Sequence, residues 1–246
     1  ESLAAKKHHR KRAFQMLRAL IDRKIIEILP SHERLGSPVR INMDLQDEFS
    51  LTETLSLYLL DSLKFLDPMA DDYALKLLSM VESIVENPKV ILYRQIDKLR
   101  KEALVDMKAE GIEFEERIEK LDQIESPKPL CEFIYNTFNT FSEKHPWVGE
   151  ENIRPKSIAR EMYETFQSFP DYVRSYGLEK SEGVLLRYLS NVYKVLVQTI
   201  PDHAKNDDID ESILFLKTVI KSTDSSLLDE WERMQHPDDK SIVSQE

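Results

Sequence analysis

The sequence predicts a mainly α-helical protein in which a partial winged helix with a short β-hairpin precedes a helical bundle. Apolar residues recur at helical spacing through most of the 246 residues, and only 5 Gly and 11 Pro interrupt them. Short β-branched runs are confined to residues 24–45. Because 41% of the residues are hydrophobic, the chain can bury a substantial core.

Residues 1–48 have the pattern of a helix followed by a two-stranded wing. From 3 to 22, apolar residues such as Leu17 and Leu20 recur among basic ones, which predicts an amphipathic helix with a cationic face. The runs 24–29 and 39–45 are separated by a segment that contains Gly36, which favours a hairpin. A helix followed by a hairpin is the second half of a winged helix, so we expect a chain cut from a longer protein.

Residues 49–236 are expected to form a helical domain, followed by a tail at 237–246. Thr52 is a plausible cap for the first helix, Asn87-Pro88 a break and Gly111 a helix end. The expected helices span residues 52–66, 71–86, 89–110, 113–124, 130–144, 155–176, 181–200 and 208–234.

The net charge of -11 is unevenly distributed along the chain. Residues 1–40 hold 10 Lys/Arg against 4 Asp/Glu, a net charge of +6, which leaves 24 against 41, or -17, for the remainder. Phosphate neutralisation requires a local density of Lys and Arg. Any contact with nucleic acid must therefore be confined to a small part of the surface.

The sequence offers no catalytic or metal-binding motif, so we expect neither an enzyme nor a cofactor in this chain. None of the glycines opens a phosphate-binding loop, and no His follows a Glu by three positions. The single Cys131 excludes an intrachain disulfide and is expected to be a small buried hydrophobe. Trp147 is expected to be a buried anchor after a helix end. With no apolar stretch near 20 residues, we expect a cytoplasmic protein without membrane contact.

Two basic clusters are candidate phosphate contacts. The first runs from Lys6 to Arg12 and supplies the candidates Lys7, Arg10, Lys11 and Arg12. The second follows Pro155, where Lys156 and Arg160 are four residues apart on one face of an expected helix. Both clusters have an equally simple interpretation as solvated charge.

Several segments resemble known helicases. The stretch 181–189 (SEGVLLRYL) resembles an element near the end of the superkiller-type, exosome-associated DExH RNA helicases. A closer resemblance, over roughly Phe14 to Met234, is to the uncharacterised C-terminal domain of bacterial DEAD/DEAH-box helicases. The segments that carry it are 107–117, 127–130, 145–148, 155–157 and 224–232.

The resemblance implies an accessory role in an ATP-dependent helicase, expected to act on RNA. ATP and Mg would bind in RecA-like motor domains that this chain lacks, and the partners would be those domains and a single RNA strand. Arg187, in the shared element, is the candidate that we expect to contact the strand, with an ion pair as the alternative. Gly183 is expected to allow a close approach of a neighbouring element. The rival function is a stand-alone helical adaptor that binds proteins through its acidic surface.

Overall fold

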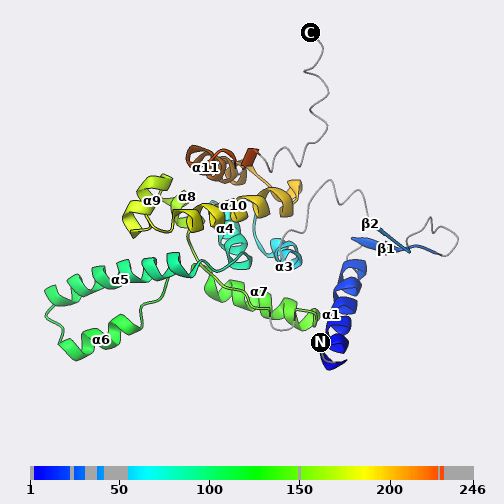
Figure 1. Ribbon diagram of the computed structural model, residues 1–246, viewed down its shortest axis with the longest axis horizontal. Helices are drawn as coiled ribbons and strands as arrows, with labels where there is room; N and C mark the ends of the chain where they lie inside the picture. Colours follow the sequence, from blue (N-terminus) through cyan, green and yellow to red (C-terminus); the bar gives the residue numbers. More distant parts are fainter. Residues whose placement is uncertain are drawn as a thin grey trace, which may run out of the picture.

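The computed structural model describes residues 3–22, 25–30, 38–41, 55–148, 151–226 and 228–229 (Figure 1). In these residues helices dominate, and the β-structure is one antiparallel pair of strands. The prediction of a mainly α fold with a short hairpin is confirmed.

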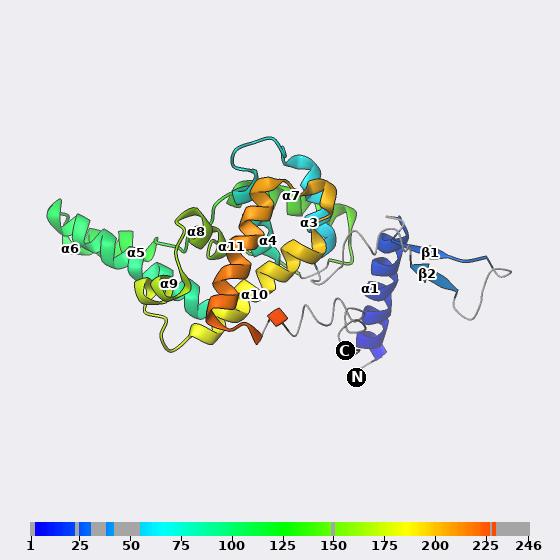
Figure 2. The same ribbon diagram turned by 90° about the horizontal axis from the view of Figure 1, so that it is seen from above.

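The N-terminal part consists of helix α1 (Leu3–Asp22) and the hairpin of β1 (Ile26–Ile28) and β2 (Val39–Ile41). In the strand pairing, Ile26 lies opposite Ile41 and Ile28 opposite Val39; residues 24 and 42–45 of the expected runs lie outside the described residues. Strand β1 follows α1 directly, and the Ile25 amide donates to the Leu20 carbonyl at 3.0 Å. Figures 1 and 2 show α1 and the hairpin together at one end of the molecule.

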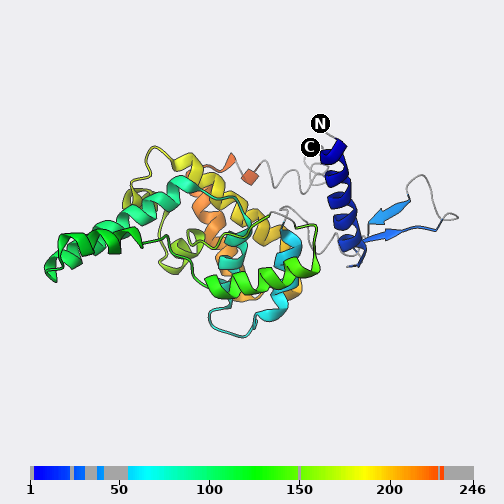
Figure 3. The same cartoon turned by 90° about the horizontal axis from the view of Figure 1, so that it is seen from below.

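The bundle is centred on α4 (Tyr73–Ile84), most of whose residues are buried, and α10 (Glu182–Thr199), half of whose residues are buried. Around them lie α3 (Ser56–Ser62), η2 (Leu63–Phe65), α7 (Cys131–Lys144), α8 (Ala159–Glu164), α9 (Phe169–Tyr176), η3 (Asp202–Ala204) and α11 (Asp207–Thr223). Helix α5 (Lys89–Ala109) and helix α6 (Phe114–Asp122) form a hairpin that projects from the bundle, as Figure 3 also shows. Helix α6 has no buried residue, so its outer turns add little to the core.

Most helix ends lie where the local signals predict them. Helix α5 begins directly after Asn87-Pro88, and Gly111 behind it has a positive φ of 73°. Trp147, after the end of α7, is 2% exposed, which confirms the buried anchor. Cys131 is only half-buried. Thr52, the domain boundary near residue 48 and the tail at 237–246 lie outside the described residues.

The single helix expected over 155–176 is wrong. Residues 153–158 instead cross the core without helical structure, α8 spans only Ala159–Glu164, and α9 begins after a separate cap at Ser168. The Ser168 hydroxyl accepts a hydrogen bond from the Asp171 amide at 3.3 Å. Between the two helices Phe166 has a φ of 49°, a left-handed conformation that stops α8 without a glycine.

Candidate nucleic-acid interface

Helix α1 presents one face on which a single aromatic side chain lies among basic ones. Lys7, Lys11, Phe14 and Arg18 follow one another at spacings of four, three and four residues, so they lie on the same side of the helix. Arg10 joins them, three residues after Lys7 and four before Phe14. All five are exposed, and 66% of the Phe14 side chain is accessible. We call these five residues the basic face of α1. Its chemistry suits a nucleic-acid strand, because an aromatic ring can stack on a base while nearby cations contact phosphates.

The opposite side of α1 fixes the helix to the bundle. Ala19 is 4% exposed, and Met16 and Leu20 pack against the same core cluster. Arg12, predicted as a phosphate contact, also points to this side. One of its guanidinium nitrogens, Nη2, lies 2.7 Å from Oε1 of Glu151, and both side chains are partly exposed. The pair joins α1 to the segment before α8, so Arg12 is separate from the basic face.

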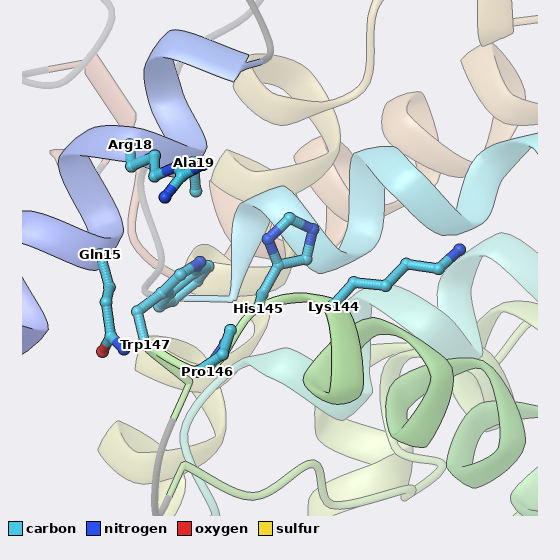
Figure 4. Close-up of a pocket in the computed structure, with 7 residues that line it drawn as sticks. All are labelled: Gln15, Arg18, Ala19, Lys144, His145, Pro146 and Trp147. Atoms are coloured by element: carbon cyan, nitrogen blue, oxygen red, sulfur yellow. The ribbon is translucent and has the colours of Figure 1, made fainter.

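A cleft of about 300 Å³ lies between α1 and the turn after α7 (Figure 4). Its lining consists of Gln15, Arg18, Ala19, Lys144, His145, Pro146 and Trp147. In Figure 4 the Trp147 indole lies between the α1 side chains and His145, and the Lys144 ammonium points away. The indole nitrogen is buried without a hydrogen-bond partner. The cleft therefore lies next to Arg18 of the basic face, and its lining contains no carboxylate.

Lys156 occupies a different environment from the one expected. Only 1% of it is exposed, and its ammonium donates to the carbonyl oxygens of Val85 and Arg154, each at 3.1 Å. The expectation that Lys156 contacts a nucleic-acid strand is therefore wrong, because a phosphate cannot reach it in this structure. The ammonium instead holds the 153–158 segment against the end of α4.

Arg160 has a similar structural role at the start of α8. Its guanidinium Nη1 donates to the Ser79 hydroxyl of α4 at 2.9 Å, and Nε lies 3.6 Å from Glu164. The side chain is only 17% exposed. Most of its donors are directed at the protein rather than at solvent, so the structure does not group Arg160 with the exposed cations of α1.

Arg187 lies on the surface of α10 and forms an ion pair there. Its Nε donates to Oε1 of Glu86 at 2.9 Å, with 63% of the arginine side chain and 36% of the glutamate exposed. This contact is the ion pair that was expected as the alternative to a strand contact, and it lies at the surface rather than in the core. Arg187, Lys156 and Arg160 thus contact α4 or the two residues that follow its end, whereas the other candidates lie on α1.

A buried carboxylate on α4 was not identified from the sequence. Glu82 is 0% exposed; its Oε1 accepts from the amides of Ile158 and Ala159 at 2.8 and 2.9 Å and from the Tyr188 hydroxyl at 2.9 Å. Its Oε2 accepts from the Arg160 amide at 3.1 Å. Glu82 therefore caps α8 from another helix. The sequence does indicate that Glu82 is buried, because it lies four residues after Leu78 in the apolar stripe of α4.

Burial dominates the electrostatics of this capping site. It raises the pKa of Glu82, although the four hydrogen bonds act in the opposite direction. Burial also raises the pKa of the Tyr188 hydroxyl, and the neighbouring Glu82 charge adds to that effect. Because every donor points at Glu82, the site is complete without a ligand and serves the fold rather than chemistry.

Neither metal-binding clusters nor membrane spans occur in the described part of the chain. No group of three or more His, Cys, Asp or Glu side chains there could hold a metal ion. None of the helices in those ranges is both long enough and apolar enough to cross a bilayer.

A family model described as a domain of unknown function (DUF3516) matches residues 1–246. Neither a curated protein nor a solved structure matches the chain.

Proposed function

We propose that this chain, which belongs to the family described as a domain of unknown function (DUF3516), is the strand-binding accessory region of an ATP-dependent helicase that acts on RNA. In this proposal the basic face of α1 contacts a single strand. The RecA-like motor domains, with their ATP and Mg, belong to the remainder of the helicase. The helicase assignment rests on the sequence resemblance, and the strand contact rests on the surface of α1.

The observation that carries the proposal is the exposed ring of Phe14 among cations. Arg10 and Lys11 lie one turn before it and Arg18 one turn after it on the same face. Its ring is accessible, and every nucleobase has a face that can stack on it. The combination favours a single strand over duplex DNA, whose bases are already stacked.

The charge of the molecule confines the contact to α1. Lys6, Lys7, Arg10 and Lys11 are exposed and form no ion pair within the described residues, whereas residues 41–246 carry a net charge of -17. A polyanion is therefore attracted at one end of the molecule and repelled by the rest. We expect weak binding that decreases steeply with salt.

Fluorescence anisotropy with a labelled single-stranded RNA of about 12 nucleotides tests the proposal. Phe14→Ala should weaken binding about ten-fold, since stacking on one base contributes about 1–3 kcal/mol. Replacing Lys7, Arg10 and Lys11 with alanine should lower the slope of log affinity against log salt by about 2, at about 0.7 per phosphate contact.

Phe114→Ala is the matched control for loss of an exposed aromatic residue. Phe114 is 61% exposed on α6, and the guanidinium carbon of Arg117 lies 5.8 Å from its ring centroid, but Glu115 and Glu116 follow it directly. This variant should keep the affinity of the unmodified chain. Equal losses for Phe14→Ala and Phe114→Ala, or tight binding that does not depend on salt, would contradict the role of α1.

A further inference from the structure

Three aromatic side chains meet at the surface where α8 faces α11. The ring centroid of Tyr163 lies 5.9 Å from that of Phe166 and 5.6 Å from that of Phe215, and the latter two are 6.4 Å apart. We call these three residues the aromatic cluster. The rings are in contact with one another, so the cluster is a continuous surface rather than a cavity.

Phe166 is unusual in both its exposure and its backbone. The side chain is 69% exposed, and its φ of 49° lies in the left-handed region that bulky residues seldom adopt. Neither feature stabilises the isolated chain, because the ring is hydrated and the backbone is strained. Such a patch is typical of a surface that a partner covers.

Carboxylates flank the aromatic cluster. Asp208 and Glu211 precede Phe215 by seven and four residues on α11, so they lie on the same face. Both are exposed and form no ion pair within the described residues. The Tyr163 hydroxyl lies 3.5 Å from the carbonyl oxygen of Asp208, and the charges of Glu211 and Asp208 add to burial in raising the pKa of that hydroxyl. A complementary partner must supply apolar side chains and cations together, since cations are also attracted to aromatic faces.

We propose that the aromatic cluster, with Asp208 and Glu211, binds the basic face of α1 from a second copy of this chain. That face supplies Lys7, Arg10 and Lys11 beside the exposed Phe14, and so matches both features of the patch. Within one chain the two surfaces do not meet, because α1 lies apart from α8 and α11 in all three views (Figures 1–3). The contact is therefore between molecules.

A charge-swap pair tests the contact by sedimentation equilibrium. One variant carries Lys7→Glu and Lys11→Glu, and the other carries Asp208→Lys and Glu211→Lys; all four positions are exposed, so both variants should fold. The unmodified chain should associate as its concentration rises. Each variant alone should stay monomeric because like charges oppose, and a 1:1 mixture should associate again. Phe166→Ala in the unmodified chain should raise the dissociation constant about ten-fold.

Each contrary result overturns the inference. An unmodified chain that is monomeric at every concentration shows that something else covers the cluster, and a mixture that stays monomeric shows that the charges do not meet. Association that Phe166→Ala leaves unchanged involves another surface. RNA binding is measured separately on the Asp208→Lys/Glu211→Lys variant, whose α1 is intact. If the unmodified chain does not bind RNA, only the proposed function is refuted. If the 1:1 mixture of the two charge-swap variants does not associate, only the self-association is refuted.

Discussion

Removing the Glu82 carboxylate should have a large effect on stability, although no surface contact is altered. In Glu82→Ala, the amides of Ile158, Ala159 and Arg160 and the hydroxyl of Tyr188 all lose their acceptor. The start of α8 has no side-chain cap of its own, so nothing local replaces the lost bonds. The 153–158 segment, which is held beside the same helix, should loosen with it.

The magnitude follows from the number of stranded donors. A buried donor without a partner costs about 1–3 kcal/mol, but the three amides lie at a helix start and can partly rearrange. We therefore expect Glu82→Ala to lower the free energy of unfolding by about 3–5 kcal/mol, the range for breaking a buried charged network. At about 2–4 °C per kcal/mol for a chain of this size, Tm should fall by roughly 6–20 °C.

Thermal and urea unfolding followed by circular dichroism measure this loss. Tyr188→Phe is the graded control, since it keeps the ring and removes one of the four donors. It should cost about 1.5–3 kcal/mol, the value of one hydrogen bond to a charged group. A Glu82→Ala variant within about 1 kcal/mol of the unmodified chain would refute the reasoning, because it would mean that the capping contacts contribute no net stability.

Three further predictions concern pH, backbone and surface charge. Burial raises the pKa of Glu82 above its ordinary value of 4.5. The stability that the protonated Glu82 side chain contributes is therefore fully present below pH 4.5 and is lost as pH rises through the folded pKa. Glu82→Gln should not show this loss when urea unfolding is measured at a series of pH values. Gly177→Ala should cost about 1–2 kcal/mol by urea unfolding because φ is 61°, whereas Gly183→Ala should be neutral or stabilising, and the reverse order would contradict this. Arg187→Ala should change the free energy of unfolding by under about 1 kcal/mol, since its ion pair with Glu86 is exposed, and a larger loss in urea unfolding would contradict this.

The sequence predicts those parts of the fold that depend on neighbours along the chain. The change from helical spacing to β-branched runs locates α1 and the hairpin, and Asn87-Pro88 and Gly111 bound α5. The helix over 155–176 is wrong because Pro155 resembles a helix start, while the true start at Ala159 is set by Glu82, 77 residues earlier. Gly183 is a smaller error: nothing lies within 4 Å of the position a Cβ would take, so it allows no close approach.

The candidate site follows the same division between local and distant contacts. The basic cluster of α1 is visible in the sequence because a helix places residues three and four apart on one face. Lys156 and Arg187 look equally cationic, but their partners Val85 and Glu86 lie 71 and 101 residues away. A sequence read residue by residue cannot distinguish a buried ammonium from an exposed one, because burial depends on how distant segments pack.

The way in which the bundle pairs its own charges explains why α1 is the surface to test. On the bundle many lysines face a carboxylate one turn away, as in Lys76–Asp72, Lys101–Asp97 and Lys120–Glu116. Such exposed pairs add little stability, but they cancel the field that each lysine would present to an approaching phosphate. On α1, Lys6, Lys7, Arg10 and Lys11 form no ion pair within the described residues, so their fields add. An anionic strand and an acidic protein surface are both attracted to such a helix, and this shared preference is why separate RNA-binding and self-association experiments are needed to identify which of them occupies it.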